Sequence, residues 1–195
     1  SGRVYSELIA AGAKTVMVGH IAQPAYQEAI EPGSAKDKVI PATLSKALMT
    51  GLLREKLGFN GVISTDASAM IGFTAAMCRS KAVPYAIACG ADVFLFNKDL
   101  DEDITYMTQG LASGVLTRER LDEAVTRILA LKASLKLHEK QAAGTLVPPQ
   151  AALSVLGCAE HKRLARDCAD KAVTLVKDKQ NLLPISPKTH KRVYL

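Results

Sequence analysis

Three polar side chains stand directly after apolar stretches of the sequence. His20 ends the stretch TVMVGH, Asp66 follows GVIST, and Asn97 ends DVFLFN. A carboxylate in such a place can act as a nucleophile, and an imidazole or an amide beside it can orient a polar substrate. If the stretches are parallel strands, the three side chains meet at the carboxyl edge of one sheet, where α/β proteins bind their ligands.

Each of these residues also has a purely structural interpretation. An aspartate at a strand end often caps the next helix, so Asp66 taken alone is as readily a cap as a nucleophile. His20 taken alone is more often a loop histidine, and Asn97 is better explained as a cap for the acidic segment that follows it. Met17 and Met70, taken alone, are explained by packing. The repetition of the pattern carries more weight than any single residue.

The elements that position these residues repeat along the chain. In each repeat, a segment with helical spacing ends at a glycine and leads into an apolar stretch; the helical segments are 5–11, 42–57 and 81–89. Glycine just past a helix end is the expected stop signal. Strands that are apolar at nearly every position are typical of a parallel sheet covered on both faces. The sequence therefore predicts an α/β fold.

The remaining segments are predicted to be a functional loop and further helices. A long loop, 21–41, follows the first strand, and loops of this length usually carry function. Helices are predicted at 99–114 and after Thr117, which is a good N-cap, although Arg120 stands where a capping box would have Glu.

The C-terminal part of the chain reads as a second unit. A helix is predicted at 158–172, followed by a strand and a turn in VTLVKDKQNLLPIS and by a further strand in RVYL. We therefore predict a first domain at 1–138, a linker at 139–150, and the beginning of a second α/β domain, incomplete, at 151–195.

Composition excludes several classes of function. The net charge of +6 is spread over the chain, and the basic run at 188–192 has no interleaved aromatic residues, which favours a solvated tail over a nucleic-acid interface. Trp is absent, so these residues alone form no Trp-lined sugar cleft. No apolar run reaches the ~18 residues typical of a membrane helix. No GxGxxG or P-loop motif predicts a nucleotide cofactor, so we expect no cofactor.

The cysteines and the first residue bear on compartment and completeness. Cys78, Cys89, Cys158 and Cys168 form no CxxC pair and no zinc-like spacing with histidine, so we expect free thiols and no metal site. Free thiols favour a cytoplasmic location. The chain starts at Ser1 with residues typical of the middle of a helix, so we interpret it as a fragment whose N-terminus, and with it the compartment, lies outside the sequence.

Four segments together carry a family resemblance. In their order along the chain, VMVGHIAQPAY, PATLS, GLLREKLGFNGVISTDASAM and AIACGADVFLF resemble glycoside hydrolase family 3, and within it the β-N-acetylglucosaminidases, also called β-hexosaminidases. The resemblance spans roughly residues 5–135, and LGFNGVISTDASAM is its most specific piece. It implies the last three strands and helices of a partial (β/α)8 TIM-type barrel, followed by the beginning of an α/β sandwich domain.

The resemblance also implies roles for the candidate site residues. Asp66 matches the catalytic nucleophile of retaining enzymes, which form a covalent glycosyl-enzyme intermediate. His20 stands where the family places a residue facing the sugar, and Met70, in the nucleophile segment, is a further candidate for substrate binding. The implied substrate is a terminal β-linked N-acetylglucosaminide from peptidoglycan or chitin fragments, which points to peptidoglycan recycling.

Part of the implied catalytic set lies outside this sequence. In the hexosaminidases the acid/base is a His–Asp pair on an earlier loop, and in the β-glucosidases it is a Glu of the second domain; Glu160 reads as a surface group instead. We therefore expect this chain alone to be inactive and to need the N-terminal part of the same protein, whether joined to it or as a separate chain. The alternatives are a β-glucosidase or β-xylosidase, a phosphorolytic relative, or a non-catalytic α/β binding module in which Asp66 is only a cap.

Overall fold

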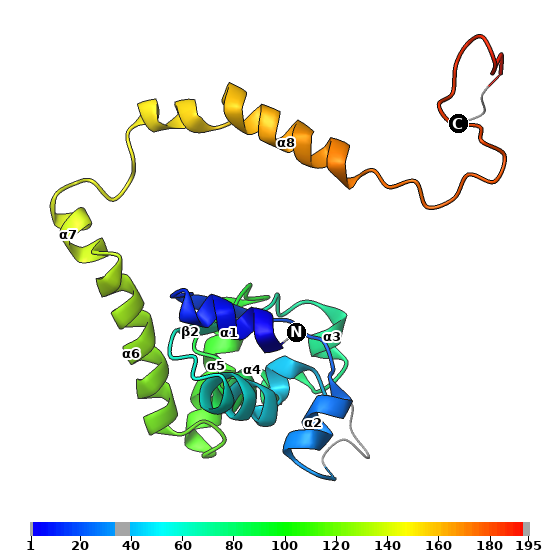
Figure 1. Cartoon of the computed structure of the whole chain (residues 1–195). Coiled ribbons are helices and arrows are strands. Elements are labelled where there is room, and N and C mark those ends of the chain that lie inside the picture. Colours follow the sequence, from blue (N-terminus) through cyan, green and yellow to red (C-terminus); the bar gives the residue numbers. More distant parts are fainter. Residues whose placement is uncertain (1, 34–39, 193–195) are drawn as a thin grey trace. The chain divides into compact units, whose positions relative to one another are not determined.

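The computed structural model describes residues 2–33 and 40–192. The chain divides into two compact units, residues 1–143 and 144–195. Figure 1 labels helices α1 to α8 and strand β2. The candidate site residues all belong to the first unit.

Two parallel strands form the sheet of the first unit. Strand β1 (Thr15–Val18) pairs with β2 (Val62–Thr65), with Thr15 opposite Val62 and Val18 opposite Thr65. Parallel strands need a crossover connection, and here helices supply it. The α/β class predicted from the sequence is confirmed.

The third predicted strand, 92–97, is much shorter than expected. It is reduced to a single parallel bridge between Ser64 and Val93, although the backbone N–H of Thr65 also donates to the carbonyl of Val93 at 3.0 Å. The ladder then stops, because the backbone N–H of Leu95 donates to the side-chain hydroxyl of Thr65 at 3.0 Å instead of to a carbonyl. The structure thus has two strands and one bridge where the sequence predicts three strands.

Most of the predicted helices are confirmed. The helices expected at 5–11, at 81–89, at 99–114 and after Thr117 are α1 (Gly2–Ala10), α4 (Arg79–Cys89), α5 (Leu100–Ala112) and α6 (Arg118–Ser134). Three short helices were not predicted: α2 (Pro24–Ile30) in the long loop, α3 (Ile71–Thr74) after Asp66, and α7 (Leu137–Ala142) at the start of the predicted linker. In the described ranges, no helix has both the length and the hydrophobicity to span a bilayer.

The single helix predicted at 42–57 is two elements in the structure. A 3-10 turn, η1 (Ala42–Leu44), is followed by extended backbone at Ser45 and then by a wide π-helix, η2 (Ala47–Lys56). The Ser45 hydroxyl accepts the backbone N–H of Leu48 at 3.3 Å, so the break has its own local hydrogen bond. Apolar spacing continues through the break, which is why the sequence does not reveal it.

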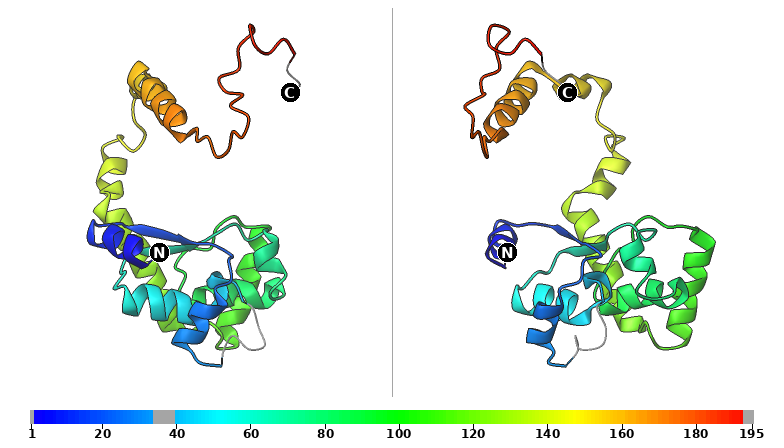
Figure 2. Two further views of the ribbon diagram at one scale, coloured as in Figure 1. Left: turned by 45° about the vertical axis from the view of Figure 1, so that its right-hand side comes forward. Right: turned by 90° about the vertical axis from the view of Figure 1, so that its right-hand side faces the viewer.

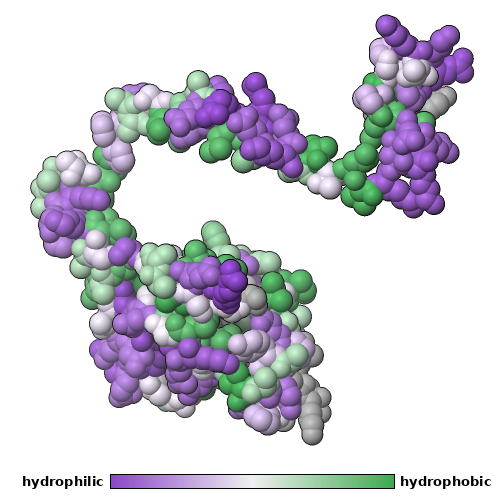
Figure 3. All heavy atoms as spheres, in the orientation of Figure 1, coloured by the Kyte–Doolittle hydropathy of each residue, from purple (hydrophilic) through white to green (hydrophobic). Residues whose placement is uncertain are grey.

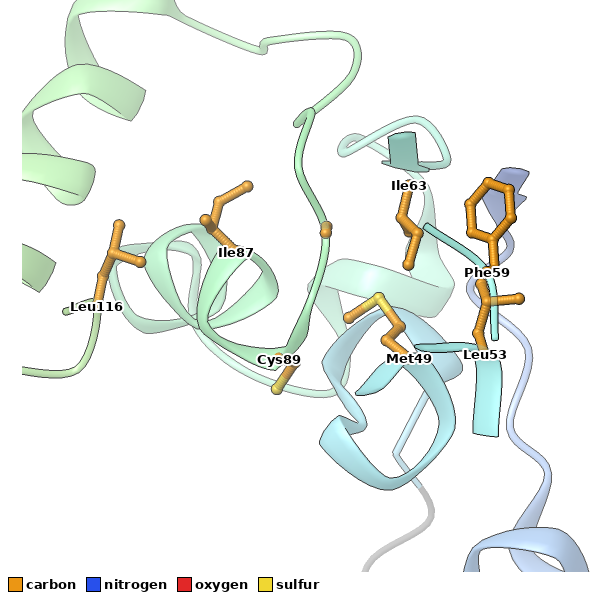
Figure 4. Packing of buried hydrophobic residues seen from close by; sticks show 8 residues of the cluster. Met49, Leu53, Phe59, Ile63, Ile87, Cys89 and Leu116 are labelled. Atoms are coloured by element: carbon orange, nitrogen blue, oxygen red, sulfur yellow. The ribbon is translucent and has the colours of Figure 1, made fainter. Parts of the chain in front are cut away.

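An apolar core fills the space between the sheet and the helices beneath it. Figure 4 shows Met49 and Leu53 of η2 beside Ile63 of β2, with Ile87 of α4 facing the same core. The buried members of this cluster are Met49, Leu53, Phe59, Ile63, Ile87, Cys89, Ala91 and Leu116. Burying each large apolar side chain contributes roughly 1.5–3 kcal/mol, so this cluster fixes the sheet on its helices.

Helix α1 and one edge of β1 are poorly covered. No residue of α1 is buried, and Figure 2 shows α1 standing apart from the helices that cover the sheet. Met17 of β1 is 57% exposed. A groove of about 280 Å³ lies beside β1, with Tyr5 and Tyr26 in its lining. Among the described residues, β1 has a strand neighbour on one side only.

The second unit contains one long helix. A 3-10 segment, η3 (Gln150–Val155), precedes α8 (Ala159–Ala172), which confirms the helix predicted at 158–172. The strand predicted from Val173 onward is wrong for the described residues, where no strand pairing follows α8. Val173 and Val176 are 84% and 90% exposed because no neighbouring strand covers them, and Figure 3 shows apolar side chains on the surface. Of the predicted terminal strand, 193–195 lie outside the described residues.

Candidate active site at the carboxyl edge of the sheet

Asp66 lies directly after β2, at the carboxyl edge of the sheet. Its backbone N–H donates to the carbonyl of Val18 at 3.1 Å, which ties it to the end of β1. Its carboxylate oxygen Oδ1 accepts the backbone N–H of Ala67 at 2.7 Å. In the part of the chain that the structure describes, no donor reaches Oδ2, and the residue is only part-buried. Among the described residues, the carboxylate is held through one oxygen and the other has no hydrogen-bond partner.

The structure also bears on the capping interpretation of Asp66. The next helix, α3, begins at Ile71, and its N-cap is Met70, with no side chain accepting a hydrogen bond there. Asp66 therefore does not cap the following helix. Its place at the strand end has to be explained in another way.

His20 follows β1 and reaches the segment that carries Asp66. Its Nε2 lies 3.0 Å from the carbonyl oxygen of Ala67, and its Nδ1 lies 2.7 Å from Oγ1 of Thr43 in η1. A carbonyl oxygen can only accept, so Nε2 carries a hydrogen, and in the neutral ring Nδ1 accepts the hydroxyl hydrogen of Thr43. The structure brings His20 and the Asp66 segment together. A contact between His20 and substrate stays a prediction, because both ring nitrogens already have partners within the chain.

Close packing holds the His20 ring. The ring centroid lies 5.0 Å from that of Phe73, which is fully buried. Gly72 passes so close that a Cβ atom there would lie 2.7 Å from the carbonyl oxygen of His20. Only glycine allows this approach of α3 to the end of β1 without a shift of the backbone.

Met70 lies on the surface at the end of the turn after Asp66. The turn closes with a hydrogen bond from the backbone N–H of Met70 to the carbonyl of Ala67 at 3.1 Å. Met70 is 46% exposed, so its side chain is accessible to a ligand. Other large apolar side chains exposed near this edge are Ile21, Ile71 and Phe96. The substrate-binding role of Met70 stays a prediction.

Asn97 neither caps α5 nor contacts Asp66. The cap of α5 is Asp99, whose Oδ1 accepts the backbone N–H of Glu102 at 3.0 Å. The side-chain amide of Asn97 instead donates to Oδ2 of Asp103 at 3.2 Å. The cap expected at Asn97 is therefore wrong by two residues, because aspartate accepts the first-turn N–H groups equally well.

Sequence reasoning missed a buried network behind the site. The guanidinium of Arg79 donates to the carbonyl and hydroxyl oxygens of Ser68 at 3.1 and 3.2 Å, and to Oδ1 of Asp103 at 2.5 Å. The Ser68 hydroxyl donates to the carbonyl of Phe96 at 2.6 Å. Phe96 has a left-handed backbone with φ of 54°. These bonds fix the segment after Asp66 to α4 and α5. The sequence around Arg79 contains no pattern that predicts them.

A second network surrounds Asp92, near the amino end of β2. Asp92 is fully buried at its side chain, where Oδ2 accepts from Arg54 at 2.5 Å and from the backbone N–H of Ile63 at 2.9 Å. Oδ1 accepts from Arg120 at 2.6 Å and lies 3.4 Å from Arg127. Burial lowers the pKa of Arg54, and Asp92 opposes that effect.

One sequence signal did point to the Asp92 network. Thr117 caps α6 as predicted, accepting the backbone N–H of Arg120 at 3.2 Å. Arg120 occupies the position where a capping box would have Glu because its side chain turns inward. It donates there to the carbonyls of Ile87 and Ala91 as well as to Asp92. The departure from the capping-box motif coincides with a partly buried arginine.

The described residues contain no cluster that fits a metal ion. Within 2–33 and 40–192, no group of three or more His, Cys, Asp or Glu side chains converges. Among the described residues, the carboxyl edge presents one part-buried carboxylate, Asp66, with apolar and hydroxyl neighbours. Such a set can supply a nucleophile, and it contains no second carboxylate close to Asp66 in the contacts of the described residues.

Comparison with known proteins identifies the family. A model of the glycosyl hydrolase family 3 N-terminal domain matches residues 1–131. A protein of Cellulomonas fimi described as a β-N-acetylglucosaminidase/β-glucosidase is 50% identical over 192 residues, which cover 98% of this chain and 33% of that protein. Beta-hexosaminidase A of Pseudoalteromonas piscicida is 32% identical over 180 residues, covering 87% of this chain and 29% of that protein.

Solved structures agree with this result. The β-glucoside phosphorylase BglX is 45% identical with a TM-score of 0.85, covering 96% of this chain and 33% of that one. A family 3 β-N-acetylglucosaminidase from Paenibacillus is 28% identical with a TM-score of 0.68, covering 91% and 32%. The chain spans about a third of the length of these relatives. Because the family model covers more than half of the chain and confirms the resemblance seen in the sequence, the chain belongs to glycosyl hydrolase family 3.

Proposed function

We propose that the protein is a retaining glycosidase that removes terminal β-linked N-acetylglucosamine, with Asp66 as its nucleophile. The observation that carries the proposal is the state of the Asp66 carboxylate, which is anchored at Oδ1 by Ala67 and has no hydrogen-bond partner at Oδ2 among the described residues. Its place at the carboxyl end of β2 is where parallel α/β folds put catalytic groups. Membership of the family supports a carbohydrate substrate.

In the proposed reaction, Asp66 attacks the anomeric carbon of the bound sugar. A bond forms between the carboxylate oxygen and that carbon while the bond to the leaving oxygen breaks, and an acid protonates the leaving oxygen. Water then displaces Asp66 and gives its proton to the same group, now a base. Neither nitrogen of His20 is free for this proton transfer, since Thr43 and Ala67 occupy both. Because the chain spans about a third of the length of its relatives, we assign the acid/base to a part of the protein outside residues 1–195, and expect this stretch alone to be inactive.

Two alternatives have specific support. The Cellulomonas relative carries both an N-acetylglucosaminidase and a β-glucosidase description, so a β-glucoside is the second candidate substrate. The similarity to a β-glucoside phosphorylase makes inorganic phosphate the second candidate acceptor in place of water. Both alternatives keep Asp66 as the nucleophile and differ in the sugar or in the group that resolves the intermediate.

The test is covalent trapping in the natural full-length protein. Fluorinated glycosyl fluorides of N-acetylglucosamine and of glucose are incubated with it, and the labelled peptide is sequenced by mass spectrometry. We expect label on Asp66, faster with the N-acetylglucosamine reagent. Faster labelling by the glucose reagent would shift the assignment to a β-glucosidase, and label on another residue, or none, would reject the mechanism.

A second assay identifies the acceptor. An aryl N-acetylglucosaminide is turned over with and without inorganic phosphate, and the products are separated by chromatography. We expect free sugar under both conditions. Sugar 1-phosphate as the main product would establish phosphorolysis instead.

A further inference from the structure

We propose that His20 is a positioning residue for Asp66: as an imidazole protonated at Nε2, it holds the carbonyl of Ala67, the residue that follows the nucleophile. This inference rests on the proposed function of Asp66. It differs from a contact with the sugar, because it assigns both ring nitrogens to the protein. His20 would then act on the reaction only through Ala67.

Ala67 is the link between the two side chains. Its backbone N–H donates to Oδ1 of Asp66 at 2.7 Å, and its carbonyl oxygen lies 3.0 Å from Nε2 of His20. The same carbonyl accepts the N–H of Met70 at 3.1 Å, so two donors hold it. Because hydrogen bonds hold both the N–H and the carbonyl of Ala67, the bond from His20 restrains the residue whose N–H anchors the carboxylate.

The His20 ring is rigid enough to act as such a support. Nδ1 is held at 2.7 Å by the hydroxyl of Thr43, which is fully buried. The ring packs against Phe73 on one side, and Gly72 closes on its backbone carbonyl. The hydrogen bond to the Ala67 carbonyl fixes the hydrogen on Nε2, and a donor at Nδ1 is compatible with that tautomer. Thr43, η1 and the end of β1 are thereby coupled to the nucleophile segment.

The proposal predicts an effect on turnover more than on binding. A misplacement of about 1 Å in a reacting group can lower the rate ~100-fold. In the natural full-length protein, we expect His20→Phe to lower kcat about 10–100-fold with KM changed less than about twofold, because Phe fills the space of the ring without its hydrogen bonds. If His20 contacted the sugar directly, KM would rise instead, and that result would overturn the proposal.

Thr43 offers a matched pair of variants that leave the imidazole in place. Thr43→Val keeps the shape of the side chain and removes the hydroxyl, so we expect kcat to fall about fivefold as the ring loses its fixed orientation. Thr43→Ser keeps the hydroxyl, and its kcat should equal that of the parent protein. Equal kcat in the two variants, each folded by its melting temperature, would overturn the proposal even if His20→Phe does not fold.

Nitrogen NMR of histidine-labelled protein reads the tautomer without reference to activity. The His20 signals are assigned by their loss in His20→Gln. We expect Nε2 protonated and Nδ1 unprotonated in the parent protein, in Asp66→Asn and in Thr43→Val, because the Ala67 carbonyl accepts from Nε2 in all three. A proton on Nδ1 in the neutral ring of the parent protein would overturn the inference. If Asp66→Asn keeps full activity, the proposed function is wrong. The NMR experiment still reports the tautomer of His20 in that case.

Discussion

Two aspartates at opposite ends of β2 have opposite surroundings. Asp92 is fully buried, with both oxygens engaged by three arginines and by the N–H of Ile63. Asp66 is part-buried, and among the described residues only the N–H of Ala67 reaches its carboxylate. A carboxylate whose acceptor sites are all occupied holds elements together, because nothing else can approach it. A carboxylate with a vacant oxygen contributes little to the fold and is available for chemistry.

The largest effect should come from Asp66→Asn, measured as activity. The amide keeps an oxygen for the N–H of Ala67 but is a poor nucleophile, so we expect kcat/KM to fall about 10³-fold or more. The melting temperature should stay unchanged, since no ion pair is lost. Steady-state kinetics and calorimetry on the natural full-length protein check both points. Near-normal activity would mean that Asp66 is not the nucleophile.

The same chemical change at Asp92 should act on stability. Asp92→Asn removes the buried charge that three partly buried guanidinium groups share, and we expect the free energy of unfolding to fall by about 3–5 kcal/mol. Urea denaturation followed by circular dichroism measures the loss. Residual folded protein should still be labelled at Asp66 by a fluorinated glycosyl fluoride. A loss well under 1 kcal/mol would show that the arginines find other partners, and would remove the contrast between the two sites.

Arg79 lies close to the candidate site, but its contacts resemble those of the buried Asp92 network. Arg79→Met leaves the buried carboxylate of Asp103 with Asn97 alone, and we expect a loss of about 2 kcal/mol of stability. Arg118→Met is the control, because it breaks an exposed ion pair with Asp122 and should have no measurable effect. Chemical denaturation measures the free energy of unfolding of the two variants. Equal stabilities would mean that the Arg79 contacts contribute nothing net.

The smallest expected effect concerns two thiols at the two ends of α4. Burial raises the pKa of Cys89 to about 11, whereas a hydrogen bond with Ser80 lowers the pKa of the exposed Cys78. At pH 8 iodoacetamide should therefore modify Cys78 first and Cys89 only after unfolding, as peptide mass spectrometry would show.

Because the folded-state pKa of Cys89 is the raised one, its contribution to stability is complete below pH ~9 and is lost as the pH rises to about 11. Early labelling of Cys89 would show that this end of α4 opens.

The sequence was sufficient for elements whose signals are local. Glycine stops, apolar strands and the Thr117 cap depend on neighbouring residues, so helices α1, α4, α5 and α6 and the parallel pairing were predicted. The break at Ser45 and the shortened strand after Val93 depend on side-chain hydroxyls that compete with backbone partners. Composition and spacing carry no sign of that competition.

The position of the candidate site could be predicted from the sequence, but the hydrogen-bond partners of its residues could not. Asp66 stood out because a charged residue ends an apolar strand. The partners of His20, by contrast, come from η1 and from the turn after β2, which are distant in sequence. Asp103 reads as an ordinary acidic residue in the first turn of a helix, yet it is buried beneath Arg79. Tertiary contacts decide such cases, and one sequence does not reveal them.

The poorly covered edge of β1 has a practical consequence for handling these residues as a recombinant protein. Among the described residues no strand pairs with this edge, and its backbone groups, with the apolar side chains of Met17 and α1 beside them, form a template onto which another strand can add. Copies of this region produced by themselves would associate edge to edge in a concentration-dependent manner. Yield would then depend on keeping the chain dilute, or on co-expressing a segment that occupies that edge.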